Sequence, residues 1–300
     1  MYLFTQQKDV GRSRAPVEGS VLGFSLLSAL AMPVPFRRFG IKYVEHGVEH
    51  YQVNGRHYPV RPGEYLLVNA HCHGRVDIDA TTPVMGLCAD LDPALMDGML
   101  NAMQQAEALD VQGLTSFFTS EEFLENRYSA QGTRVGSLMR SLMERFRKEP
   151  GGPHEVTGSV YMALAEAVVL DHLQVIPGLR RVQAVRTGTR KDIYRRVELG
   201  RALIHGRFHE RLEVADMAGA AAMSDYHFFR AFRAVHDQSP HQYLLDLRLR
   251  HAQELLRRGY YEVADVALMC GFVDHPTFTK AFKRRFGLAP SAWTNTLRRN

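Results

Sequence analysis

Four side chains between residues 226 and 233 combine cationic and aromatic groups at the spacing of one helix face. Tyr226, Phe229, Arg230 and Arg233 lie at i, i+3, i+4 and i+7, so a helix would present them together. An arginine can donate to O6 and N7 of guanine, and an aromatic edge can contact the methyl group of thymine. The segment therefore predicts a helix with one face suited to reading base edges.

A second set of this kind follows about fifty residues later. His275, Pro276, Thr277 and Lys280 fall on the outward side of another predicted helix, with His275 at its entrance. Lysine can donate to guanine, and the methyl group of threonine can contact that of thymine. Further cations in this part of the chain are expected to contact phosphates, which position a protein on DNA without carrying sequence information: Arg233, Arg248, Arg250, Lys283, Arg284 and Arg285.

The two sets lie in two copies of one sequence pattern. The segment VADMA at 214–218 recurs as VADVA at 263–267, and the phenylalanine pair at 228 and 232 recurs at 278 and 282. Each copy predicts a short helix, a turn, and a second helix whose buried face carries the phenylalanines. This is the helix-turn-helix plan, in which the second helix enters the major groove of DNA.

The turns and helix starts of the two copies are similar but not identical. Ser224 and Asp274 are the expected N-caps of the two second helices. Gly271 supplies backbone freedom to the turn of the second copy, whereas Ala222 lies in the corresponding turn of the first. We therefore expect a less regular turn in the first copy.

A long helix is expected to join the copies. Ser239 and Pro240 form a favourable helix start, and apolar residues continue at helical spacing to Leu256. About 18 residues of helix span roughly 27 Å, close to one turn of DNA at ~34 Å. Both second helices could then enter successive major grooves.

Charge is distributed unevenly along the chain. Residues 190–300 hold 19 Lys and Arg against 12 Asp and Glu, whereas the other 189 residues hold 18 against 20. A basic part next to a nearly neutral part indicates that one domain meets a polyanion. The polar stretch Thr187–Lys191 is the expected linker, which predicts domains at 1–186 and 187–300.

The amino-terminal half has the pattern of a small β structure followed by helices. Alternating segments at 41–44, 50–53, 56–60 and 65–68 predict strands, with Asn54-Gly55 as a two-residue hairpin turn. Helical periodicity begins after Pro93, and an apolar helix is expected at about 156–173. The predicted fold class is therefore α+β, with a β-barrel or sandwich and flanking helices before an all-α domain.

From about Tyr194 to Trp293 the chain resembles the carboxy-terminal domain of the AraC/XylS family of bacterial transcription regulators. The densest agreement is in SPHQYLLDLRLRHAQELL at 239–256 and VADVALMCGFVDHPTFTKAFKRRFGLAP at 263–290. The resemblance implies that the two sets of side chains described above lie where base contacts are made. Departures include Ala222 in the first turn and Thr294 after Trp293, where the family commonly has glycine and arginine.

The segment IKYVEHGVEHYQVNGRHYPVRPGEYLLVNAHCH at 41–73 is similar, more loosely, to the cupin-like effector domains of this family. The resemblance implies a barrel that holds a small molecule and helices that mediate dimerisation. His71 and His73, if they share one strand face, could line such a site or ligate a metal, but the favoured interpretation is two structural histidines at the rim of the barrel. The stretch 33–40 lacks the upstream histidines of metal-binding cupins, so we expect no metal, no cofactor and no enzyme activity.

Other features restrict the compartment. The first residues lack the pattern of a secretory signal, and the most apolar stretch, at 21–32, is shorter than the ~20 residues that span a bilayer. Three cysteines without a pairing pattern, Cys72, Cys88 and Cys270, fit a reducing environment. A cytoplasmic location and no membrane partner are expected.

Two classes of function remain open. In the first, the protein is a sequence-specific regulator, an activator by resemblance, that binds promoter DNA as a homodimer, responds to a small-molecule effector and contacts RNA polymerase. In the second, it is an architectural or non-specific DNA binder whose amino-terminal half only dimerises. The base-facing side chains favour the first class, and a third class, a cupin enzyme tethered to DNA, would require a bound metal.

Overall fold

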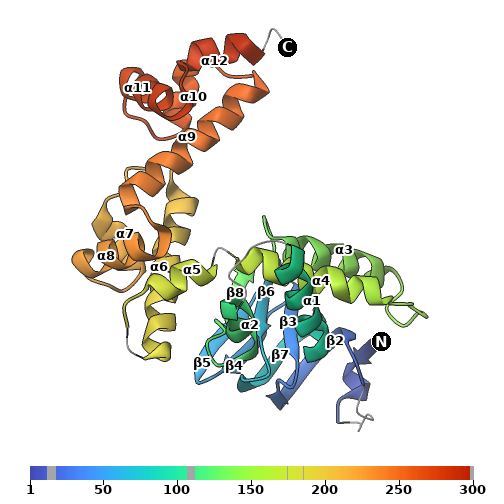
Figure 1. Ribbon diagram of the computed structural model, residues 1–300. Coiled ribbons are helices and arrows are strands. Elements are labelled where there is room, and N and C mark those ends of the chain that lie inside the picture. Colours follow the sequence, from blue (N-terminus) through green and yellow to red (C-terminus); the bar gives the residue numbers. More distant parts are fainter. Residues whose placement is uncertain (12–17, 107–111, 174, 185, 298–300) are drawn as a thin grey trace. The chain divides into compact units, whose positions relative to one another are not determined.

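The chain forms two compact units. The structure is a computed structural model that describes residues 1–11, 18–106, 112–173, 175–184 and 186–297 (Figure 1). The units are Met1–Ile176 and Pro177–Asn300. Residues 177–186, assigned to the first domain on sequence grounds, thus belong with the second unit. The physical reason is that Arg181 donates to the backbone oxygen of Val235, at 3.3 Å, within the second unit.

Unit 1 is built on one sheet, in which the described residues form eight strands. The strand order is β1-β2-β7-β3-β6-β8, and β4 pairs with both β5 and β7. The long strand β7 pairs with β3 through its second half and with β4 through its first, so the sheet folds around a core. The strands are β1 Tyr2–Gln6, β2 Val21–Pro35, β3 Phe39–His46, β4 Glu49–Val53, β5 Arg56–Val60, β6 Glu64–Val68, β7 His73–Leu91 and β8 Asn126–Ser129.

The four strands expected between 41 and 68 are confirmed as β3 to β6. Asn54 and Gly55 connect β4 to β5 with φ angles of 50° and 78°. Positive φ at both central residues is the geometry of the tight hairpin turn that suits the twist of paired strands. Alternation along β4 buries Glu49, Tyr51 and Val53, so these side chains point into the barrel.

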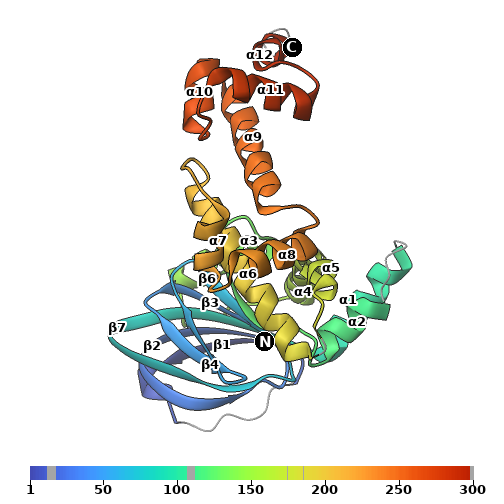
Figure 2. The ribbon, with the colours of Figure 1, turned by 90° about the vertical axis from the view of Figure 1, so that its left-hand side faces the viewer.

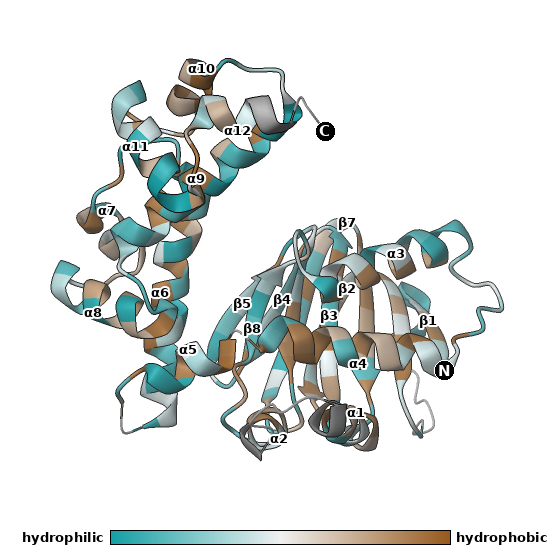
Figure 3. Ribbon diagram, turned by 45° about the horizontal axis from the view of Figure 1, so that its top comes forward, coloured by the Kyte–Doolittle hydropathy of each residue, from teal (hydrophilic) through white to brown (hydrophobic). Residues whose placement is uncertain are grey.

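Helices cover the sheet of unit 1. They are α1 Pro93–Ala106, α2 Gln112–Thr119, α3 Arg134–Lys148 and α4 Gly158–His172, with the short 3-10 helix η1 Gln7–Asp9 after β1. Helix α4, the expected apolar helix, packs against α1 and α3 and crosses in front of the strands in Figure 3. Among the described residues, Gly158–Arg181 is the one stretch long and apolar enough to cross a membrane. Its buried side chains include Leu164 and Val168, as expected for a core helix.

His172 at the end of α4 is buried as a neutral side chain. In the tautomer that satisfies both neighbours, Nδ1 donates to the backbone oxygen of Val168 at 2.8 Å and Nε2 accepts from Tyr128 at 3.2 Å. Burial lowers the pKa of His172 from 6.5 to about 4. The folded state therefore resists taking up a proton that the unfolded chain binds readily.

This histidine predicts a loss of stability in mild acid. Because the folded pKa is depressed, the contribution is complete above pH 6.5 and declines as the pH falls toward 4, by about 3 kcal/mol in all. Urea unfolding followed by circular dichroism at pH 7 and pH 4.5 measures it. His172→Gln should lose less stability over this interval than the wild type, and an equal loss in both would contradict the assignment.

The described residues of unit 2 form helices joined by turns and loops, with no strand. Its helices are α5 Val175–Arg181, whose first two residues still belong to unit 1, α6 Thr187–Arg207, α7 Val214–Ala220, α8 Asp225–His236, α9 Pro240–Arg258, α10 Val263–Met269, α11 His275–Phe286 and α12 Pro290–Leu297. The expected linker at 187–191 is wrong, because these residues begin α6 and Lys191 is buried. A polar stretch is compatible with the first turns of a helix that is polar on most of its surface.

The internal repeat is confirmed as two helix-turn-helix units. Helices α7 and α8 form the first, and α10 and α11 the second. The phenylalanines at the repeated positions, Phe228, Phe232, Phe278 and Phe282, are fully buried. Helix α9 runs between the two helix-turn-helix units in Figure 2, as expected for the linking helix.

Candidate functional site

Helix α8 presents the first predicted reading face. Ser224 caps it, its Oγ accepting from the backbone NH of His227. Tyr226 and Phe229 are 65% and 37% exposed, and Arg230 is exposed beside them. The guanidinium of Arg230 lies 5.6 Å from the ring centre of Tyr226 and donates to its hydroxyl at 3.3 Å. The face thus holds a cation that is oriented by an aromatic ring and open to a partner.

Helix α11 presents the second predicted reading face. Asp274 caps it, its carboxylate accepting from the backbone NH of Thr277 at 2.6 Å, and this bond lowers the pKa of Asp274. His275, Pro276, Thr277 and Lys280 are all exposed, as predicted. The cap therefore fixes the start of the helix, and the predicted side chains stand on its open surface.

Helix α9 sets the distance between the two reading helices. It has 19 residues, about 28 Å of helix, and is bounded by a capping box at Ser239 and by Gly259 with φ of 73°. This length agrees with the expected spacing of roughly one DNA turn. The length of α9 therefore matches the roughly 27 Å expected for the helix that links the two helix-turn-helix units.

The predicted phosphate contacts are not equivalent. Arg233, Lys283 and Arg284 are exposed. Arg250 and Arg285 are also exposed, but both lie near one carboxylate, Asp246, at 3.6 Å and 2.7 Å.

Arg248 differs from the prediction. Its guanidinium donates to the backbone oxygens of Phe208 at 2.7 Å and Glu210 at 2.6 Å. These bonds fix the segment after α6 against α9, so Arg248 has a structural role and is a poor phosphate contact.

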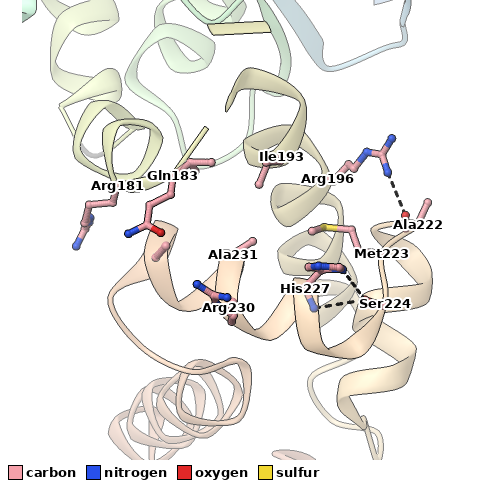
Figure 4. A pocket seen from close by; sticks show the side chains of 12 residues that line it. Arg181, Gln183, Ile193, Arg196, Ala222, Met223, Ser224, His227, Arg230 and Ala231 are labelled. Carbon is pink, nitrogen blue, oxygen red and sulfur yellow. Dashed lines mark hydrogen bonds between the residues drawn. The ribbon is translucent and has the colours of Figure 1, made fainter. Parts of the chain in front are cut away.

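A cavity of about 640 Å³ adjoins the first reading face (Figure 4). Arg230, Ala231 and His227 line it from α8, and Arg196 lines it from α6. The guanidinium of Arg196 donates to the backbone oxygen of Ala222 at 3.1 Å. This cavity could not be predicted from the sequence, because its walls come from segments about thirty to fifty residues apart without a common periodicity.

The two turns differ in backbone strain, as expected from their residues. Gly271 has φ of 77°, and the matching Ala222 has φ of 50°. A left-handed conformation costs an alanine about 1 kcal/mol relative to glycine. We expect Ala222→Gly to stabilise unit 2 by about 1 kcal/mol, measured by urea unfolding. Gly271→Ala serves as the opposite control and should destabilise, because the added Cβ would lie 2.7 Å from the backbone oxygen of His209. Destabilisation by both changes would contradict the strain at Ala222.

The predicted effector residues do not line the cavity of unit 1. His73 begins β7, but His71 lies in the preceding turn, where its Nε2 is 2.7 Å from the backbone oxygen of Thr119. The premise that both share a strand face is therefore wrong. Among the described residues, no group of three or more His, Cys, Asp or Glu side chains is placed to hold a metal ion.

Unit 1 has a cavity of about 190 Å³ inside the barrel. One part of its wall is aliphatic, and the other is polar. The polar side chains are Thr5, Ser25, Lys42, Glu49, Tyr51 and Cys88.

Two buried ionisable groups give this cavity its character. Lys42 Nζ lies 2.6 Å from Asp90, and Glu49 accepts from the hydroxyl of Tyr51 at 2.7 Å. Burial lowers the pKa of Lys42, but Asp90 and other neighbours outweigh it and raise the pKa overall. Burial raises the pKa of Glu49 above its ordinary value. The alternation of strand β4 was the signal that could have identified Glu49, because it places a carboxyl group at an inward position.

Comparisons with known proteins match both units. Residues 35–164 match the model of the AraC-like ligand binding domain, and residues 217–296 match that of a helix-turn-helix domain. Together the two matches span more than half of the chain.

Curated relatives are similar in the carboxy-terminal part. An uncharacterized HTH-type transcriptional regulator of Escherichia coli K12, YidL, is 39% identical over 104 residues, which are 34% of this chain and 35% of that protein. The Msm operon regulatory protein of Streptococcus mutans is 31% identical over 98 residues, 33% of this chain and 35% of that protein. The chain thus spans about a third of the length of these relatives.

Solved structures are similar as well. The DNA-binding domain of AdpA, solved in complex with a target DNA, is 32% identical, with 34% of this chain and 92% of that chain covered and a TM-score of 0.33. ToxT from Vibrio cholerae is 9% identical, with 92% and 98% covered and a TM-score of 0.37. With a ligand-binding domain of AraC type before a repeated helix-turn-helix domain, the chain belongs to the AraC family of transcriptional regulators.

Proposed function

We propose that this protein binds specific promoter sequences through α8 and α11 and regulates transcription under the control of a small molecule held in the barrel of unit 1. The observation that carries the proposal is the pair of capped helices that expose a cation next to an aromatic ring or a threonine. Arg230 beside Tyr226 and Lys280 beside Thr277 can each contact base edges in a major groove. The exposed Arg233, Lys283 and Arg284 would contact the flanking phosphates.

The effector site is proposed to be the barrel cavity rather than the surface at His71 and His73. A cavity with a few polar groups on a largely apolar wall is the usual form of a small-molecule site. A ligand changes the state of the protein only if it binds one arrangement better than another. We therefore propose an effector that shifts the protein between DNA-binding and resting arrangements, with no catalytic step.

The remaining parts of the proposal follow the family. The protein acts in the cytoplasm as a homodimer formed through unit 1, and as an activator it contacts RNA polymerase. The alternative is an architectural protein that binds DNA of any sequence. Its support is the basic surface of unit 2, which would attract any duplex.

Selection of duplexes by the full chain distinguishes the sequence-specific regulator from the architectural protein. Random duplexes are enriched for binding, and a selected duplex and its scrambled control are then titrated at several salt concentrations by fluorescence anisotropy. The regulator is expected to bind the selected duplex roughly 10³-fold more tightly or better. Equal binding to both, with a steep dependence on salt, would support the architectural alternative.

A further inference from the structure

The barrel cavity has a charge balance that discriminates between classes of effector. Its lining includes two ionisable side chains of opposite kind, Lys42 from β3 and Glu49 from β4. Both are less than a tenth exposed. An ionised group buried away from water is stable only when an opposite charge or several hydrogen bonds compensate it.

The charge of Lys42 is already compensated. Asp90 on the neighbouring strand β7 lies 2.6 Å from Lys42 Nζ, and the pairing of β3 with β7 holds the two side chains together. A carboxylate or phosphate entering the cavity would meet a lysine that has its counter-ion and would lie close to Glu49. An anionic effector is therefore disfavoured.

Among the described residues, Glu49 has no ion-pair partner of this kind: Lys42 is near enough to act on its pKa, but Lys42 is already paired with Asp90. Its Oε2 accepts from Tyr51, which leaves Oε1 to accept from a ligand. The carboxyl group lies over Gly86 of β7, where an added Cβ would be within 2.4 Å of Oε1, so the absence of a side chain at 86 makes room for it. Burial raises the pKa of Glu49, and a cation beside it would favour the ionised form.

The remaining wall limits the size and shape of the ligand. Leu27, Leu30, Val34, Val76, Ile78 and Leu87 form its aliphatic part. A volume of about 190 Å³ lies below the ~300–1,000 Å³ of sites for drug-sized molecules. The site thus suits a short apolar chain that ends in one polar group.

We propose that the effector is a small aliphatic amine, bound with its ammonium group against Glu49 and its chain against the aliphatic wall. This inference rests on the proposed role of the barrel as the effector site. Ser25 and Tyr51 are positioned in the same lining and supply further oxygens to the ammonium group.

Three probes with carbon chains of the same length test the chemical class of the effector. Butylamine, 1-butanol and butyrate are titrated against the full chain in the absence of DNA, by calorimetry and by the shift of the melting temperature. Butylamine should bind at least 10-fold more tightly than the alcohol and the acid. Equal or tighter binding of 1-butanol or butyrate, or no binding of any probe, would overturn the proposal.

Matched variants locate the site. Glu49→Gln keeps the shape and the acceptor for Tyr51 but removes the charge, and should weaken butylamine binding at least 10-fold. Glu121→Gln makes the same change at an exposed position of unit 1 and should leave the affinity for butylamine unchanged. Amine binding of wild-type strength in folded Glu49→Gln protein would overturn the proposal. Because no DNA is present, failure here is distinct from failure of sequence-specific binding, which the selection experiment measures by itself.

Discussion

Replacing Arg230 and Lys280 together by alanine should reduce binding to a selected duplex far more than binding to random DNA. Each lost base contact is expected to cost roughly 1–3 kcal/mol, so the double variant should bind the selected duplex on the order of 10²-fold more weakly or worse. Both side chains are exposed, and Arg230 is bonded to Tyr226 at the surface. The fold should therefore persist, since exposed substitutions of this kind change stability by about 0.5 kcal/mol or less.

A control for charge is available in unit 1. Arg147→Ala with Lys148→Ala removes the same two charges from exposed positions at the end of α3. Anisotropy titrations of wild type, double variant and control with selected and scrambled duplexes separate base reading from general attraction. If the Arg230 and Lys280 variant distinguished the two duplexes as well as the wild type does, the reading face would have to lie elsewhere.

The helix-turn-helix units could be predicted because several local signals agree in them. The phenylalanine pairs define a buried helix face, Ser224 and Asp274 mark helix starts, and Gly271 marks a turn. Each signal acts within a few residues along the chain, and its repetition makes coincidence improbable. For the same reason the exposure of Tyr226 and its neighbours followed from the helix period alone.

Features that depend on partners distant in the chain could not be predicted in this way. Arg248 was expected at a phosphate, but its carbonyl partners lie about forty residues earlier in the chain. Lys42 and Asp90 are 48 residues apart and meet only through the register of β3 and β7. His71 was misplaced because β7 begins only at His73, so His71 lies in the preceding turn and not on a strand face.

The second helix-turn-helix unit has a core of its own. Side chains of α9, α10 and α11, among them Leu249, Val266 and Phe278, form one buried cluster with Phe282. Phe282 is fully buried, and its ring centre lies 4.6 Å from that of Phe286 and 6.2 Å from that of Trp293. Because Trp293 is the single tryptophan of the chain, its fluorescence reports on this core alone.

Phe282→Ala should therefore destabilise the second helix-turn-helix unit by about 3–5 kcal/mol, because it leaves a cavity that the surrounding rings cannot fill. The urea concentration at the midpoint of the Trp293 fluorescence transition should become much lower. The affinity for the selected duplex should fall to that of the first helix-turn-helix unit alone. Phe232→Ala makes the same change in the equally buried core of the first helix-turn-helix unit and is the matched control. It should move the Trp293 transition far less, because the buried cluster around Phe282 is formed by side chains of α9 and the segments that follow it; equal shifts would mean that both helix-turn-helix units unfold as one. The duplexes retained by each variant would then show which part of the selected site each reading helix contacts.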